Sequence, residues 1–158
     1  MDRYWDPRIE TMSRDELGDV QAHRLHWQVR RCWDGSEFYH EHLEAAGVRP
    51  EDVGGLDDLE RLPLLTRVEL EADRSAHPPF GRAVVARANW LIVPKTPSTL
   101  STEADAVNRV SVAARALWAF GTRPASVLAV AQFGEPRSAL ETIQAAVPQV
   151  GRHAPPRA

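Results

Sequence analysis

The chain has 158 residues, the usual size of one domain, so we expect one main domain rather than two independent cores. Hydrophobic residues make up 43% of it and charged residues 26%, which is ordinary for packed protein and argues against general disorder. With 19 basic and 22 acidic residues, the net charge of −3 leaves no positive excess to hold a phosphate backbone. Composition therefore argues against a nucleic-acid partner.

Localisation is predicted from what the sequence lacks. No run approaches the roughly 18 apolar residues that cross a bilayer, and residues 1–6 lack the apolar segment of a signal peptide. The single cysteine, Cys32, cannot form an internal disulfide, which fits a reducing compartment. We expect a cytoplasmic protein with no membrane partner.

The first part of the chain predicts a helical hairpin. Ser13-Arg14-Asp15-Glu16 has the pattern of a capping box and opens a helix to about Trp33. Ser36 can cap a second helix over 37–46, which Gly47 would end in the left-handed conformation. The first helix carries two apolar lines, so we expect it to meet neighbours on two sides; the lines are Val20 with Trp27, and Leu25 with Val29 and Cys32.

Short helical turns are expected over 48–63, where prolines and glycines are frequent. A second capping box, Thr66-Arg67-Val68-Glu69, opens a short helix that ends before His77-Pro78-Pro79. A strand is possible at 83–86.

The second part predicts a strand, a helix and a strand. Residues 90–93 and 127–131 are short apolar runs typical of buried strands, and 102–120 has helical periodicity with Gly121 as its stop. This order fits one right-handed βαβ crossover with parallel strands. A last helix over 137–147 would end before Pro148.

The expected organisation is a single domain over 1–150, with a helical portion at 1–81, a partial α/β portion at 82–150 and a disordered tail at 151–158. Two parallel strands are normally part of a larger sheet, and a free edge exposes unpaired backbone groups. The fold therefore looks incomplete, and something else is expected to cover it.

A series of short segments runs through the chain in a fixed order: Tyr4–Pro7, Ile9–Leu17, Trp27–Arg31, Phe38–Tyr39, Leu43–Val48, Leu56–Leu59, Arg61–Pro63, Pro79–Gly81 and Gly121–Pro124. In order and spacing they resemble the N-terminal region of phenylacetate-CoA ligases. The resemblance is closest over 4–81 and extends to about 130. It implies a mostly helical α/β fold, in which a helical hairpin is followed by a partial βαβ unit like the start of a ligase large domain.

Phenylacetate-CoA ligases belong to the adenylate-forming enzymes, which activate an aryl acid with ATP and magnesium and then transfer the acyl group to coenzyme A. The family's phosphate-binding loop is rich in glycine, serine and threonine and corresponds here to 89–97. Leu91 and Pro94 replace its glycines, so the backbone cannot wrap a triphosphate. What remains is a vestigial loop in which Lys95, Thr96, Ser98 and Thr99 could keep some affinity for anions.

The chain also stops where the family's adenine, ribose and catalytic-lysine motifs would follow, so we expect no ligase activity from it alone. No catalytic residue, cofactor or metal site is predicted. His23, His26 and Cys32 could be imagined as metal ligands, but a solvated basic helix face is the better interpretation. Cys32 has no motif that would make it a nucleophile.

Aromatic residues gather in the first quarter of the chain. They can build core, but with an incomplete sheet they can equally anchor a protein interface. The candidate partner interface is Tyr4, Trp5, Trp27, Trp33, Phe38 and Tyr39.

Four functional hypotheses remain open. The first is a shortened, non-catalytic ligase relative, a pseudoenzyme that acts as an accessory or assembly subunit by binding protein, with another protein or a second copy as its partner. The second is one piece of a split aryl-CoA ligase that needs a partner chain for its nucleotide and coenzyme A sites. A small binder of an aromatic acid or acyl-CoA and a gene remnant without selected function are the others.

Overall fold

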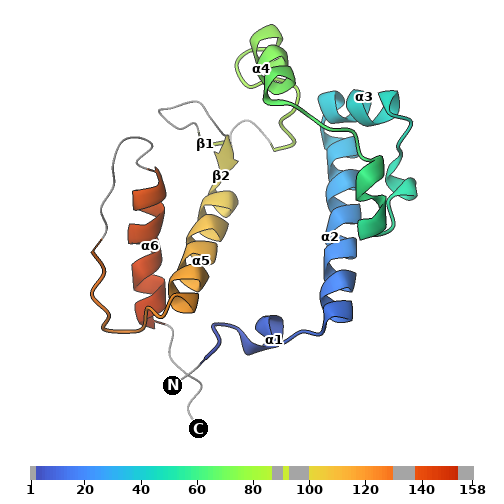
Figure 1. Ribbon diagram of the computed structural model, residues 1–158. Helices are drawn as coiled ribbons and strands as arrows, with labels where there is room; N and C mark the ends of the chain where they lie inside the picture. Colours follow the sequence, from blue (N-terminus) through green and yellow to red (C-terminus); the bar gives the residue numbers. More distant parts are fainter. Residues whose placement is uncertain (1–2, 87–90, 93–99, 130–137, 153–158) are drawn as a thin grey trace. The chain divides into compact units, whose positions relative to one another are not determined.

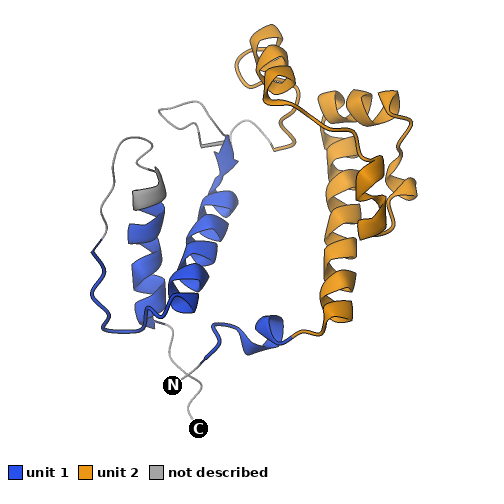
Figure 2. Ribbon diagram, in the orientation of Figure 1, with its two compact units in different colours: residues 1–11, 89–158 blue, residues 12–88 orange. Residues whose placement is uncertain are grey.

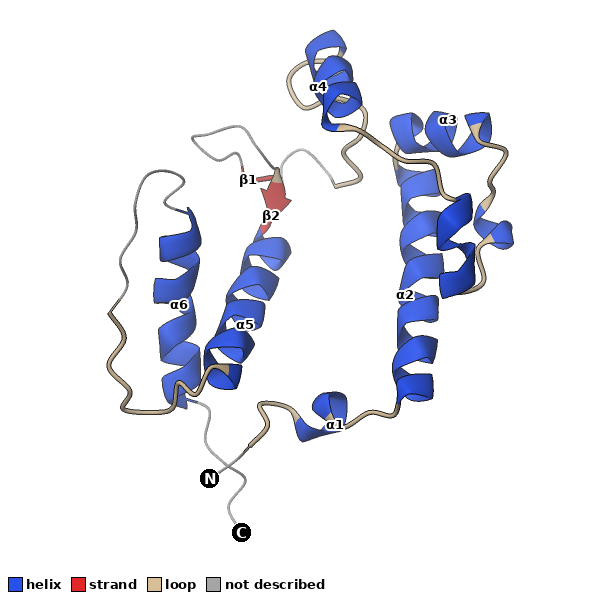
Figure 3. Ribbon diagram, in the orientation of Figure 1, coloured by secondary structure: helices blue, strands red, loops and turns tan. Residues whose placement is uncertain are grey.

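The computed structural model describes residues 3–86, 91–92, 100–129 and 138–152, and most of them are helical (Figures 1 and 3). The elements in chain order are α1 (Pro7–Glu10), α2 (Arg14–Gly35), α3 (Glu37–Ala45), the 3-10 helices η1 (Pro50–Asp52) and η2 (Leu56–Arg61), α4 (Arg67–Ala76), β1 (Leu91–Ile92), β2 (Ser101–Thr102), α5 (Glu103–Ala119) and α6 (Ser138–Arg152). The predicted class, a mostly helical α/β fold, is confirmed.

The chain divides into two compact units, which Figure 2 colours separately. Unit 1 comprises residues 1–11 and 89–158, and unit 2 comprises residues 12–88. This boundary lies close to the predicted change from a helical to an α/β portion at 81–82. The prediction of a single domain over 1–150 stays a prediction.

In unit 2 the predicted helical hairpin is confirmed. Ser13 Oγ accepts the N–H of Glu16 at 3.2 Å, while the Glu16 carboxylate accepts the N–H of Ser13 at 2.8 Å, so the capping box is complete. Ser36 Oγ likewise accepts the N–H of Tyr39 at 3.2 Å and starts α3. Gly47 follows α3 with φ of 68°, the left-handed conformation expected of it.

The core of unit 2 is a small aliphatic cluster between the hairpin and the turns that follow it. Its buried members are Val29, Leu43, Val48 and Val53, and Leu25, Trp33 and Leu62 pack against them. The predicted short helical turns are η1 and η2, and both lie against α2. The Leu25–Val29 line of α2 meets this core. Among the described residues of unit 2, neither Val20 nor Trp27 belongs to it.

A buried carboxylate ties α4 to α3. The Asp73 side chain is 3% exposed and accepts the backbone N–H of Arg82 at 2.6 Å and its Nε–H at 3.1 Å. Arg82 Nη1 also donates to Glu41 Oε1 at 3.0 Å, and Ser36 Oγ donates to the Arg82 carbonyl at 2.8 Å. Residues 83–86 continue as irregular chain, without the strand considered possible there.

Unit 1 is built on the packing of α5 against α6. Ala114, Trp118, Ala146 and Val150 are buried between them. The Trp5 ring meets Trp118 edge-on, with their centroids 5.7 Å apart. The helix predicted over 102–120 is confirmed as α5, with Thr102 as its cap and Gly121 after it at φ of 92°.

Strand pairing differs in detail from the expected βαβ unit. The strand predicted at 90–93 is present at Leu91–Ile92, but it pairs antiparallel with β2, with Leu91 opposite Thr102. Residues 127–129 of the predicted second strand are not in a strand, and Val127 is 96% exposed, while residues 130–131 lie outside the described ranges. The short return from β1 to β2 permits only an antiparallel pair. A strand over 127–129 would find no neighbouring strand among the described residues to satisfy its backbone groups.

The last helix is longer than predicted. Pro148 was expected to end it, but α6 continues through Pro148 to Arg152. Ala146 and Val150, on either side of this proline, are both buried against α5. Their packing outweighs the backbone hydrogen bond that the proline removes. The rest of the predicted tail, 153–158, lies outside the described residues.

Candidate functional site

The vestigial phosphate loop lies outside the described residues, including Lys95, Thr96, Ser98 and Thr99. The helix that follows it is described. Thr102 Oγ1 accepts the N–H of Asp105 at 3.2 Å, and the Asp105 carboxylate accepts the N–H of Thr102 at 2.8 Å. The first turn of α5 therefore holds its own capping box and two carboxylates, Glu103 and Asp105, which disfavour an approaching phosphate.

The imagined metal ligands of α2 have other contacts. His26 Nδ1 lies 2.9 Å from the Val53 carbonyl oxygen, which fixes the ring at the edge of the core. Gln28 Nε2 donates to Cys32 Sγ at 3.4 Å, and burial raises the pKa of the Cys32 thiol, so the thiol stays protonated. Across the described ranges, no group of three His, Cys, Asp or Glu side chains could hold a metal ion.

Several carboxylates of unit 2 have lowered pKa values, and the causes are helix caps and ion pairs. Hydrogen bonds from the backbone and side chain of Ser13 lower the pKa of Glu16, and hydrogen bonds from the Thr66 side chain and backbone lower that of Glu69. Burial raises the pKa of Asp73, but the hydrogen bonds from Arg82 outweigh it and the net shift is downward. These carboxylates are structural, because each one's partners are the groups that hold a helix end or a loop.

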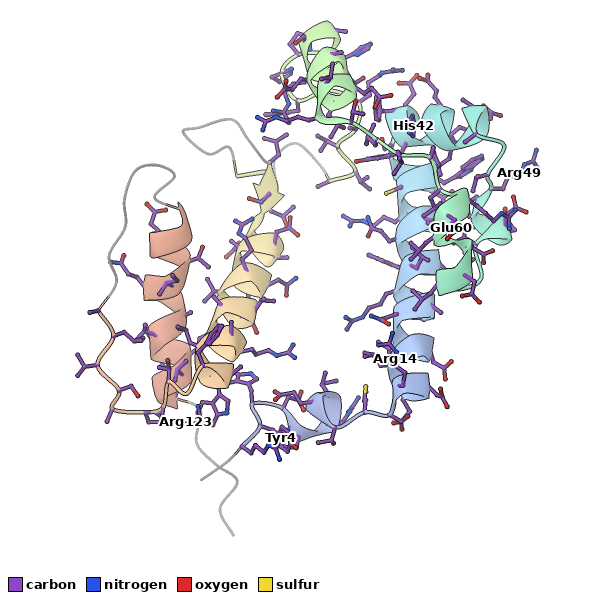
Figure 4. The ribbon with its side chains drawn as sticks, viewed as in Figure 1. Tyr4, Arg14, His42, Arg49, Glu60 and Arg123 are labelled. Carbon is purple, nitrogen blue, oxygen red and sulfur yellow. The ribbon has the colours of Figure 1, made fainter. Side chains whose placement is uncertain are left out.

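The six aromatic residues proposed as an interface are divided between the two units. Tyr4, labelled in Figure 4, lies before α1 in unit 1 under the Arg3 guanidinium, at 5.3 Å from its ring centroid. Trp5 packs on Trp118 in the same unit. The other four are in unit 2.

Three of those four aromatics make local packing contacts on the hairpin. Trp33 stacks on His40 with centroids 4.1 Å apart, and Phe38 meets Tyr39 edge-on at 5.6 Å. All three are half-buried. The fourth, Trp27, is 56% exposed, and the Arg31 guanidinium lies 5.4 Å from its ring centroid.

Other apolar side chains are more exposed than these aromatics, and sequence analysis missed them. Phe120 at the end of α5 is 90% exposed, and Leu64 before α4 is 92% exposed. Phe120 directly follows α5, and Leu64 lies between η2 and α4. Their place next to a helix terminus, beside Gly121 and Pro63, was the available signal.

Comparison with known proteins places the chain. No family profile matches it. The phenylacetate-coenzyme A ligase of Escherichia coli (strain K12) is 33% identical over 132 residues, which cover 80% of this chain. That of Thermus thermophilus is 32% identical over 131 residues, covering 78%. The chain belongs to the phenylacetate-CoA ligase family. It spans 29% and 28% of the length of these two relatives.

Solved structures of adenylate-forming CoA ligases share this fold. The crystal structure of 2-hydroxyisobutyryl-CoA ligase in the postadenylation state, with R3-HIB-AMP, matches 95% of this chain with a TM-score of 0.83 and 28% identity. Its thioesterification state, with 2-HIB-AMP and CoA, matches with a TM-score of 0.82. In both cases this chain covers 33% of the ligase. Among the described residues, no helix is long and apolar enough to cross a membrane.

Proposed function

We propose that this chain is a non-catalytic member of the phenylacetate-CoA ligase family, a pseudoenzyme that acts as an accessory or assembly subunit by binding another protein in the cytoplasm. The observation that carries the proposal is that large apolar side chains are left exposed in both units of a fold shared with CoA ligases. Exposed apolar surface of this kind marks sites of protein association.

The absence of catalysis by the chain alone is supported by its chemistry. Adenylation needs several donors and charges positioned around one leaving pyrophosphate. The phosphate-loop sequence has no glycine between Asn89 and Thr102, and the first turn of α5 carries the carboxylates Glu103 and Asp105. A triphosphate therefore finds neither a cradle nor a favourable helix end.

Protein binding is supported by the exposure of specific side chains. Phe120 and Val127 in unit 1, and Leu64 in unit 2, lose almost none of their accessible surface to packing. Covering a side chain of this size gains about 1.5 to 3 kcal/mol. Of the proposed interface aromatics, Trp27 is the one that remains free enough to contribute on its own.

A second candidate function is one piece of a split aryl-CoA ligase. It is favoured by the 95% coverage of this chain in the match to a CoA ligase holding both 2-HIB-AMP and CoA. A fold retained over nearly its whole length is what completing a ligase from two chains would require. The two functions differ in one respect, which is whether the assembled complex adenylates an aryl acid.

The test begins with the purified, tagged chain and its own cell extract. We expect one protein to be retained in fixed ratio, with the ratio set by native mass spectrometry. Phe120→Ser combined with Leu64→Ser should reduce retention at least tenfold. A matched control is Arg115→Ser with Arg67→Ser, which replaces exposed side chains near the same positions.

Activity separates the two candidates. ATP–pyrophosphate exchange with phenylacetate and related aryl acids should be absent from the chain alone and from the complex if the chain is an accessory subunit. Exchange by the complex alone would replace the first proposal with the split ligase. Exchange by the isolated chain, or a folded monomer that retains no partner, would contradict both.

A further inference from the structure

One exposed patch of unit 2 is aromatic and basic. Trp27 lies on the opposite side of α2 from the core residue Val29, because side chains two residues apart on a helix point in nearly opposite directions. Arg31 lies over the Trp27 ring, and Arg24, one turn before it, is exposed on the same side. In the part of the chain that the structure describes, no carboxylate lies within ion-pair distance of either arginine. We call Arg24, Trp27 and Arg31 the basic patch.

A second exposed patch of the same unit is aliphatic and acidic. Leu59 is 49% exposed and Leu56 36% exposed, one turn apart on η2. Asp57 and Glu60 flank them, both exposed (Glu60 is labelled in Figure 4), and neither has an ion pair within the described ranges. Asp58, between them, is already paired with Arg61 at 3.3 Å. We call Leu56, Asp57, Leu59 and Glu60 the acidic patch.

The two patches are complementary, but one molecule cannot bring them together. Each has an apolar centre beside two unpaired charges, and the charges are of opposite sign. η2 lies against α2 near the core, whereas Trp27 projects from the other side of that helix. A second copy of this chain would supply an acidic patch for the basic patch and a basic patch for the acidic patch.

We propose that two copies of the chain associate through unit 2, with the basic patch of each seated on the acidic patch of the other. Such a contact is isologous and closes on itself, so it produces a dimer and each patch pair is formed twice. Trp and Arg are the residues that most often carry binding energy at interfaces, especially where neighbouring contacts exclude water. This association does not depend on the proposed accessory function, which requires a different protein and is tested at Phe120 and Leu64.

The test is a charge exchange on the full chain, followed by native mass and analytical ultracentrifugation over a range of concentrations. The unaltered chain should dimerise, and raising the salt concentration should weaken the dimer. Arg24→Glu with Arg31→Glu, and separately Asp57→Lys with Glu60→Lys, should each raise the dimer Kd at least tenfold, because like charges then face each other. An equimolar mixture of these two variants should form a heterodimer with restored affinity, because both patch pairs are again of opposite sign.

Folding and nonspecific charge effects are controlled separately. Arg8→Glu with Arg14→Glu makes the same charge change outside the basic patch and should leave the dimer Kd unchanged. Restored association in the mixture shows that both variants are folded, and circular dichroism checks each alone. The proposal is overturned if the unaltered chain is a monomer throughout, if the single charge-reversed variants still dimerise normally, or if two folded variants fail to associate when mixed. None of these results bears on the retention of a different protein through Phe120 and Leu64.

Discussion

The two units are stabilised in different ways. In unit 2, α2 and α4 begin at capping boxes, each formed within four consecutive residues. The elements are joined by a small aliphatic core and by the ion pair of the buried Asp73 with Arg82. In unit 1, α5 and α6 are held together by packing around one large residue, Trp118. Trp5, more than a hundred residues away in sequence, completes that packing.

This difference predicts where each unit is vulnerable. A unit that depends on one aromatic side chain should lose most of its stability when that side chain is shortened. The stability of a unit held by ion pairs and helix caps should instead depend on pH and on single hydrogen bonds. Substitutions of a buried tryptophan, a buried carboxylate, two glycines and two helix caps test the comparison, from the largest expected effect to the smallest.

Trp118→Ala should have the largest effect. Removing a buried tryptophan costs about 3 to 5 kcal/mol, because the cavity cannot collapse fully. The Trp5 ring also loses its edge-on partner. Hydrogen exchange read by mass spectrometry should show lost protection in α5 and α6, with protection in α2 and α3 unchanged.

Trp27→Ala is the matched control for that change. It removes the same side chain from a position that is 56% exposed and belongs to no buried cluster. At concentrations where the chain is monomeric, its effect on the free energy of unfolding should stay within about 0.5 kcal/mol. Equal losses from the two tryptophan variants would contradict the assignment of Trp118 as the centre of unit 1.

Asp73→Asn should destabilise unit 2 by about 2 to 3 kcal/mol. The substitution removes a carboxylate that is 3% exposed. This carboxylate accepts one hydrogen bond from the backbone N–H of Arg82 and one from its charged guanidinium. Chemical denaturation followed by hydrogen exchange should place this loss in α3 and α4. A matched control is Glu44→Gln, which neutralises an exposed carboxylate of the same hairpin and should change little.

The same carboxylate sets a pH dependence. The pKa of Asp73 is lower in the folded chain than its ordinary value of about 3.9, so its contribution is complete above that value. It is lost as pH falls through the lower folded pKa, where the carboxylate binds a proton. The stability difference between the unaltered chain and Asp73→Asn should therefore shrink on acidification below about pH 4. A difference that stays constant down to pH 2 would contradict this role.

Gly81→Ala and Gly121→Ala compare the units at one kind of residue. Both glycines have positive φ, 79° and 92°, which an alanine adopts at a cost of about 1 to 2 kcal/mol. A Cβ on Gly81 would lie 2.6 Å from Asp73 Oδ2 and 3.2 Å from the Cα of Arg74, whereas one on Gly121 would meet nothing within 4 Å. Thermal unfolding should show a loss of about 2 kcal/mol for Gly81→Ala and about 1 kcal/mol for Gly121→Ala.

Features that depend on adjacent residues could be predicted from the sequence. Every capping box lies within four consecutive residues, so Ser13–Glu16 and Thr66–Glu69 could be found without knowing the fold. The pairing of β1 with β2 and the passage of α6 through Pro148 depend on residues elsewhere in the chain, so local patterns did not reveal the one and placed the end of the other too early. The candidate interface is limited in the same way. The sequence does not show that Trp27 is exposed while Trp33 packs against the core, because exposure depends on residues elsewhere in the chain.

Removal of one cap from each unit should have a small effect, and it decides whether the units are stable separately. Ser13→Ala and Thr102→Ala each delete a hydroxyl that accepts a helix N–H, at a cost of about 1 kcal/mol. If the units unfold independently, hydrogen exchange should change only in α2 and its neighbours for Ser13→Ala, and only in α5 and α6 for Thr102→Ala. If both substitutions lower protection across the whole chain, the boundary near residue 88 separates two sets of contacts, but the two units fold and unfold together. The charged ties of unit 2 and the tryptophan packing of unit 1 would then be parts of one cooperative domain.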